Sequence, residues 1–141
     1  MKDFCIIGSG ISGATIANAL SKKYSLDVYD KARGVGGRSS NKKINKNESF
    51  DHGAQYISPK SIQFKKFIKN LIAKKVVKKW AGKHLFLNTD KKENKKHIKI
   101  IGKKGNSAIS KYLLKNIDCS FNNEVIKIFN KNKVWEIYFS D

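Results

Sequence analysis

Three glycines near the start of the chain, Gly8, Gly10 and Gly13, have a spacing that suits the binding of a phosphate chain. They form the pattern G-x-G-x-x-G directly after the apolar run Phe4–Ile7. In this pattern the first glycine permits a tight turn, the second lets the backbone approach a pyrophosphate, and the third lets a helix pack closely against a strand. A helix that begins at such a turn presents free N–H groups and a partial positive charge to the phosphates.

A carboxylate, Asp30, stands close to the expected offset of about twenty residues beyond the glycines. It closes a second apolar segment, Leu26–Tyr29, and a carboxylate there accepts hydrogen bonds from the hydroxyl groups of an adenosine ribose. It would repel a 2′-phosphate, which disfavours NADP. The glycines and Asp30 together predict a dinucleotide site, and the alternative is a glycine turn before a helix that binds nothing.

The only two arginines of the chain, Arg33 and Arg38, lie in a loop with Gly34, Gly36 and Gly37, whereas the other 28 of the 30 basic residues are lysines. A guanidinium group presents a planar fork of donors that grips a phosphate in two places. The glycines let the loop turn sharply and lie against a ligand. A loop of this kind after the ribose-binding acid suits a dinucleotide larger than NAD. The alternative is a flexible loop with a solvated arginine.

A parallel sheet with helices would position these residues. The sequence predicts strands over 4–7 and 26–29 around a helix over about 11–23, which is the first βαβ unit of a doubly wound fold. We expect an α/β fold, a Rossmann-like FAD/NAD(P)-binding domain whose doubly wound parallel sheet carries an added antiparallel β segment. The other predicted elements are an irregular stretch over 31–49, a strand ending at 57, helices over about 61–75 and 107–116, an edge strand over 76–80, and hairpins pairing 85–87 with 97–101 and 125–129 with 134–139.

The charge and the cysteines limit the class of protein. A net charge of +19 suits nucleic acid or an anionic membrane surface, but the lysines lie in scattered pairs without interleaved aromatic residues. We therefore interpret them as solvated faces and expect no specific nucleic-acid partner. Cys5 and Cys119 stand far apart, which favours free thiols in a reducing compartment, and the histidines have no ligand-like spacing. No apolar run approaches a membrane span or a signal peptide, so we expect a cytoplasmic protein with no metal site and no membrane contact.

Two segments carry a resemblance to a known family. Asp30–Arg38, DKARGVGGR, is similar to the second signature of FAD-dependent flavoproteins of the amine oxidase type. Asp51–Ile57, DHGAQYI, resembles the renalase-like branch of that family. Gly105–Leu114 and Val125–Ile137 resemble a later helix and hairpin of the same branch, so that the similarity runs, with gaps, from residue 3 to residue 139.

The resemblance implies FAD as the cofactor and gives positions for its contacts. They are Gly8, Gly10, Ser12 and Gly13 at the phosphates with Ile11 beside them, Asp30 at the adenosine ribose with Lys31 beside it, Gly37 and Arg38 near the pyrophosphate, Gln55 and Tyr56 along the ribityl and isoalloxazine side, and Val125 at the adenine. It assigns no catalytic residue to this chain.

The family is longer than this chain. The resemblance therefore implies that residues 1–141 are an N-terminal FAD-binding domain with part of a substrate-domain β segment around 76–101, and that a C-terminal half is absent. It implies an oxidoreductase that transfers hydride to flavin from a small substrate, an amine or a reduced nicotinamide, with a complementary C-terminal half as partner. The alternatives are a non-catalytic dinucleotide-binding module, a subunit of a split enzyme, or a basic nucleic-acid binder.

Overall fold

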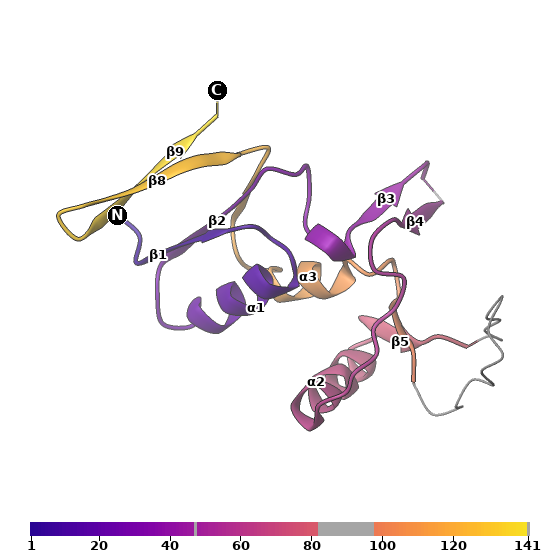
Figure 1. Cartoon of the computed structure of the whole chain (residues 1–141). Coiled ribbons are helices and arrows are strands. Elements are labelled where there is room, and N and C mark those ends of the chain that lie inside the picture. Colours follow the sequence, from indigo (N-terminus) through magenta and orange to yellow (C-terminus); the bar gives the residue numbers. More distant parts are fainter. Residues whose placement is uncertain (47, 82–97, 141) are drawn as a thin grey trace, which may run out of the picture.

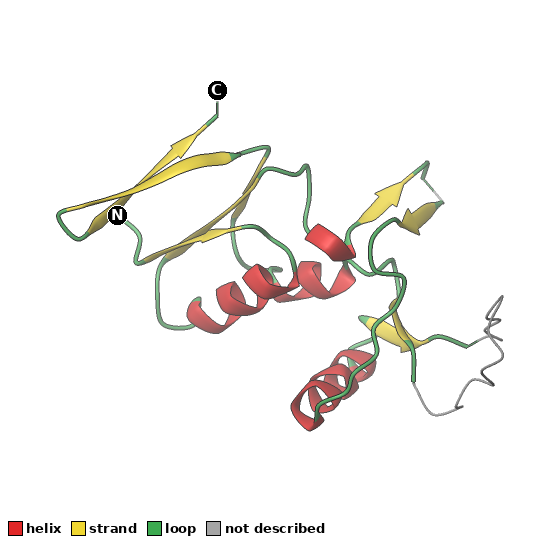
Figure 2. Cartoon of the chain, in the orientation of Figure 1, coloured by secondary structure: helices red, strands yellow, loops and turns green. Residues whose placement is uncertain are grey.

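The described residues form a three-stranded parallel sheet and three two-stranded antiparallel sheets (Figure 1). The structure is a computed structural model that describes residues 1–46, 48–81 and 98–140. The order of strands in the parallel sheet is β1-β2-β7. This is the α/β class expected from the sequence, and Figure 2 shows its helices and strands by colour.

The first βαβ unit forms as the sequence predicts. Strand β1 (Phe4–Ile7) leads into helix α1 (Ile11–Leu20) and strand β2 (Leu26–Asp30), and β1 and β2 pair in parallel. Helix α1 packs on one face of the sheet through small residues, because Ala14 and Ala17 are fully buried. It ends at Leu20, short of the predicted end near residue 23, because the apolar face ends there and polar residues follow.

The third parallel strand, β7 (Cys119–Phe121), is an element that the sequence prediction missed. It pairs with β2, with Val28 opposite Cys119. Helix α3 (Ala108–Leu113), predicted over a longer range, precedes it and lies beside α1. The Asn18 side chain donates a hydrogen bond of 2.7 Å to the carbonyl of Leu113, which joins the two helices.

A hairpin of β8 (Val125–Lys131) and β9 (Val134–Phe139) confirms the predicted pairing of these segments. The two residues of its turn, Asn132 and Lys133, have φ of 50° and 67°, which is the backbone of a two-residue hairpin turn. The hairpin lies on the side of the sheet away from α1 (Figure 1), where the Phe139 ring contacts the Tyr29 ring at 4.7 Å between centroids.

The segment between β2 and α3 differs in part from expectation. The stretch predicted to be irregular contains a 3-10 turn (Gly37–Ser39) and strand β3 (Asn41–Lys43). Strand β3 pairs antiparallel with β4 (Ser49–Asp51) to form a hairpin. A local contact stabilises this hairpin, because the Asn45 side chain accepts from the Glu48 N–H at 2.8 Å and closes the turn. The predicted strand ending at 57 is reduced to one bridge, between Ile57 and Ile100.

Helix α2 (Ile62–Ala73) confirms the predicted second helix, and Ser61 caps it by accepting from the Phe64 N–H at 3.2 Å. Strand β5 (Val77–Lys79) follows and pairs antiparallel with β6 (Ile100–Gly102). The predicted strand over 85–87 lies outside the described residues. Within them, no helix is long and apolar enough to cross a membrane.

The core runs along α1, α2, α3 and the strands that they cover. Burial of each leucine, isoleucine or valine side chain in this core contributes about 1.5–3 kcal/mol. The buried members of this core are Ile6, Ala14, Ala17, Leu26, Val28, Ile68, Leu71, Val77, Ile100, Ile109, Leu113 and Leu114.

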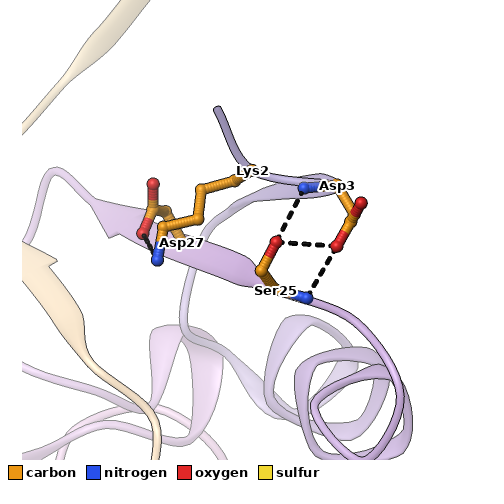
Figure 3. Close-up of polar contacts among 4 residues, drawn as sticks. All are labelled: Lys2, Asp3, Ser25 and Asp27. Carbon is orange, nitrogen blue, oxygen red and sulfur yellow. Dashed lines mark hydrogen bonds and ion pairs between the residues drawn. The ribbon is translucent and has the colours of Figure 1, made fainter.

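Polar contacts fix the register where β1 and β2 begin (Figure 3). The Asp3 carboxylate accepts from the Ser25 N–H at 2.8 Å and from the Ser25 hydroxyl at 2.7 Å. Lys2 and Asp27 form an ion pair of 3.4 Å, a partly exposed contact of the kind that contributes roughly 0.2–1 kcal/mol. These contacts hold the amino ends of the strands, so that their carboxyl ends stand at fixed positions on the opposite edge.

Candidate functional site

A cavity of about 430 Å³ lies at the carboxyl end of β1. In parallel α/β sheets, ligands bind at this edge of the sheet. The walls come from the turn after β1, the first turn of α1, the 3-10 turn and one residue after β4. Its lining residues are Ile7, Gly8, Gly10, Ile11, Ser12, Gly13, Gly36, Gly37, Arg38, Ser39 and Ala54.

Gly8, Gly10 and Gly13 of the turn differ in whether the protein's own structure requires a glycine at that position. Gly8 has φ of +98°, which a residue with a side chain rarely adopts. A Cβ on Gly13 would lie 2.0 Å from the carbonyl oxygen of Gly8, so only glycine lets α1 approach the strand this closely. A Cβ on Gly10 would meet no described atom nearer than 3.8 Å, so the packing of the protein itself leaves room there.

Within the part of the chain that the structure describes, the first turn of α1 leaves N–H donors without a protein partner. Its N-cap is Gly10, which has no side chain to cap the helix, and the first turn holds no acidic residue. The first intrahelical bond runs from the Ala14 N–H to the Gly10 carbonyl at 2.9 Å. The free N–H groups of residues 11–13 therefore lie at the cavity, at the amino end of the helix, which carries a partial positive charge. This arrangement binds anions.

The loop that carries Arg38 lies directly against the glycine turn. The Gly36 N–H donates to the Ser9 carbonyl at 3.2 Å, and a Cβ on Gly37 would lie 3.3 Å from the Cα of Gly10. Arg38 lines the same cavity as the first turn of α1, and within the described residues its guanidinium makes no hydrogen bond or ion pair. Arg33 is exposed and does not line this cavity.

A buried asparagine, Asn106, holds the far side of this loop. Its side chain donates to the Ala54 carbonyl at 2.6 Å and accepts from the Gly102 N–H at 2.8 Å. The Asp51 carboxylate accepts from the Asn106 N–H at 2.8 Å. The Ala54 N–H in turn donates to the Arg38 carbonyl at 2.8 Å. These contacts connect the start of α3 to the backbone of Arg38. Asp51, Ala54 and Asn106 lie in segments that carry the family resemblance, but the sequence assigned them no contact role.

Asp30 turns its carboxylate toward the glycine turn. Oδ2 accepts from the Ser9 N–H at 2.7 Å and from the Ser9 hydroxyl at 2.5 Å, and Oδ1 accepts from the Ala32 N–H at 2.8 Å. Partial burial raises the pKa of Asp30, but the three hydrogen bonds outweigh it and leave the pKa below its ordinary value. Asp30 is therefore held as an anion, with three of about four acceptor positions in use.

The structure divides the predicted contacts into two groups. Those that line the cavity are Gly8, Gly10, Ile11, Ser12, Gly13, Gly37 and Arg38. The others do not line it: Asp30, Lys31, Gln55, Tyr56 and Val125. Contact of either group with a cofactor stays a prediction. The sequence assigned no contact role to the lining residues Ile7, Ser39 and Ala54, and it placed Gly36 only in the loop expected to lie against a ligand.

Of the residues that do not line the cavity, Lys31 and Val125 lie near Asp30, whereas Tyr56 lies in a separate aromatic cluster. Lys31 forms an ion pair of 3.3 Å with Glu124, the residue before Val125. The Asn123 N–H donates to the Asp30 carbonyl at 3.1 Å, which brings the start of β8 to the end of β2. The Tyr56 ring instead lies 5.8 Å from the Trp80 ring, with Lys99 Nζ 5.0 Å from its centroid.

Comparison with known proteins adds to this geometry. Residues 6–71 match a family model described as an NAD(P)-binding Rossmann-like domain, and they include the glycine turn, α1, β2 and the Arg38 loop. The chain has a Rossmann-like dinucleotide-binding fold.

Two solved structures share this Rossmann-like fold. A double mutant of putrescine oxidase matches with a TM-score of 0.68 at 12% identity, over 98% of this chain and 54% of that one. The tetracycline destructase Tet(51) matches with a TM-score of 0.56 at 16% identity, over 96% of this chain and 34% of that one. The chain therefore spans about half the length of the putrescine oxidase that it matches.

Proposed function

We propose that this chain binds FAD, and that it does so as the dinucleotide-binding part of an amine-oxidase-type flavoprotein. The observation that carries the proposal is the shared cavity of about 430 Å³, in which the uncapped first turn of α1 and Arg38 stand together. Donors from a helix terminus and a guanidinium suit the two phosphates of a pyrophosphate. The open space at Gly10 admits such a group without displacement of protein atoms.

The residues that would hold the cofactor have separate roles. The N–H groups of residues 11–13 would donate to phosphate oxygens, and Arg38 would pair with the pyrophosphate from the other wall. Asp30 has one acceptor position left on Oδ1, which would accept a hydroxyl of the adenosine ribose. Val125 would lie on the adenine side, because β8 begins beside the end of β2.

FAD is favoured over NAD by features beyond the ADP half that both share. The loop after Asp30 carries Arg38 back to the glycine turn and is held there by Ala54. The segments DKARGVGGR and DHGAQYI, whose resemblance points to FAD, are the two that form this wall of the cavity. The solved structure with the higher TM-score is a putrescine oxidase whose cofactor binding was redesigned.

The reaction proposed for the whole protein is hydride transfer from a small substrate, an amine or a reduced nicotinamide of the renalase type, to bound flavin. Flavin supplies the redox chemistry, and the residues described above supply binding and orientation. Gln55 and Tyr56 would face the ribityl and isoalloxazine end. We propose a complementary C-terminal half as the partner that completes this activity, since the matched putrescine oxidase is longer.

A titration of the full chain with FAD, followed by amide NMR, tests the proposal. We expect saturable shifts at residues 11–13 and 36–39, with ADP producing part of the same pattern. NADP should bind more weakly than FAD because Asp30 repels a 2′-phosphate. FAD shifts that are absent from the glycine turn would refute the proposal, whereas binding of ADP and NAD but not FAD would leave only a dinucleotide-binding module.

A further inference from the structure

A second cavity, of about 440 Å³, lies between the C-terminal end of α2 and the start of α3. It shares no lining residue with the cavity at the glycine turn. Four of its lining residues are lysines, namely Lys75, Lys103, Lys104 and Lys111. A volume of this size is within the range of about 300–1,000 Å³ found for small-molecule sites.

The lysines of this cavity exceed what the composition supplies. Four of the seven lining residues are lysines, against 28 of 141 in the chain, and none is acidic. Among the described residues, neither of the two ion pairs includes any of these four ammonium groups. Lys74 adds a fifth ammonium group, because its Nζ donates to the Tyr112 hydroxyl at 2.6 Å. Exposed charges of one sign around a hollow raise the local concentration of anions.

The rest of the lining is apolar and includes a ring. Val76, Ala108 and Tyr112 are all partly buried. Tyr112 lines the cavity, and Lys74 Nζ lies 5.3 Å from the centroid of its ring. A ligand that matches this lining has an apolar or aromatic body as well as negative charge.

Backbone hydrogen bonds hold two sides of the cavity together. At the end of α2, the Val76 N–H donates to the Leu71 carbonyl at 2.9 Å, and Lys75 adopts the left-handed φ of 58°. The Lys103 N–H donates to the Val76 carbonyl at 3.0 Å, which ties the turn after β6 to α2. The segments that carry Val76 and Lys103 are therefore joined by backbone hydrogen bonds.

We propose that this cavity binds a small organic anion with at least two negative charges, phosphate or carboxylate, on a ring or short apolar body. The site is separate from the dinucleotide site. The ammonium groups neutralise the charges, and Val76, Ala108 and Tyr112 cover the apolar body. Inorganic phosphate satisfies only the first requirement and is expected to bind more weakly.

Phenyl phosphate is the probe for this proposal, and amide NMR on the full chain is the readout. We expect saturable shifts at Val76, Lys103, Lys104 and Ala108, with at least a fivefold lower Kd than for inorganic phosphate. Shifts at the glycine turn instead, or equal Kd values for the two anions, would overturn the proposal. A single-stranded oligonucleotide that shifts amides along the whole surface and displaces phenyl phosphate would assign these lysines to nucleic acid and also overturn it.

A pair of charge-matched variants separates this site from the general charge of the chain. The first replaces three cavity lysines (Lys103→Gln, Lys104→Gln and Lys111→Gln), and the second replaces three exposed lysines elsewhere (Lys22→Gln, Lys65→Gln and Lys66→Gln). We expect the first to raise the Kd for phenyl phosphate at least tenfold and the second to change it less than twofold. Equal effects would show that diffuse charge, and no built site, attracts the anion.

Discussion

Gly13 and Gly8 lie so close together that a Cβ on Gly13 would stand 2.0 Å from the carbonyl oxygen of Gly8 and 3.3 Å from a methyl group of Ile6. The obstructing atom is backbone, which cannot turn away as a side chain would. The third glycine of the turn is therefore required by the packing of α1 on β1, independent of any ligand.

Gly13→Ala is expected to destabilise the protein by about 3 kcal/mol, since overpacking of this kind costs 1–3 kcal/mol or more. Gly34→Ala is the control, because a Cβ there meets nothing within 4 Å. It should leave stability unchanged or raise it by about 0.4–1 kcal/mol through the unfolded chain. Urea denaturation measures both, and a Gly13→Ala variant as stable as the control would contradict the close packing.

Asn106→Ala is expected to cost about 2–4 kcal/mol, because it leaves the Gly102 N–H and the Ala54 carbonyl without their partner in a buried region. It should also weaken FAD binding, since Ala54 holds the Arg38 backbone. Asn116→Ala, at an exposed residue, is the control and should change neither quantity. An Asn106→Ala variant that loses stability but keeps wild-type FAD affinity at low temperature would remove the positioning role.

Asp30→Asn tests the hydrogen bonds at the glycine turn through their pH dependence. The pKa of Asp30 lies below 3.8 in the folded protein, so its carboxylate adds stability above about pH 3.8 and loses this as the pH falls through the folded pKa. The variant should be less stable than the wild type at pH 7, and the difference should shrink in more acidic solution. Thermal unfolding at pH 7 and at a pH below 3.8 measures the difference in stability between the variant and the wild type. The same difference at the two pH values would contradict the assignment.

Lys75→Gly is expected to raise stability by about 1 kcal/mol. Lys75 follows the end of α2 with φ of 58°, a conformation that costs other residues roughly 1–2 kcal/mol and glycine little. Lys79→Gly, in strand β5 and without a positive φ, should lower stability instead. If the two changes have the same sign in urea denaturation, the strain at Lys75 is absent.

The sequence predicted those elements of the fold that depend on a few neighbouring residues. The apolar run before the glycine turn, the small residues of α1 and the turn of the β8–β9 hairpin each act over a few residues, and all three were predicted. Strand β7 was missed because it has only three residues, none fully buried, and its position depends on pairing with β2.

The candidate site could be predicted only where its residues lie in one signature. The cavity-lining glycines and Arg38 lie in two short motifs, whereas Ala54 is held at the cavity by contacts with Arg38 and with Asn106, 52 residues further along the chain. Such a contact has no period or spacing that a sequence reveals. Tyr56 illustrates the same limit, because its motif suggests the cofactor but does not reveal that its ring packs with Trp80; its contact with a cofactor stays a prediction.

We propose that Arg38 and the first turn of α1 bind the same dinucleotide. The most direct test of this proposal is the Kd for FAD in two variants that keep the charge, Arg38→Lys and Arg33→Lys. We expect Arg38→Lys to weaken binding by about 1–2 kcal/mol, which is roughly five- to thirtyfold, through loss of the bidentate contact. Arg33→Lys should bind like the wild type, and equal Kd values for the two variants would contradict the account.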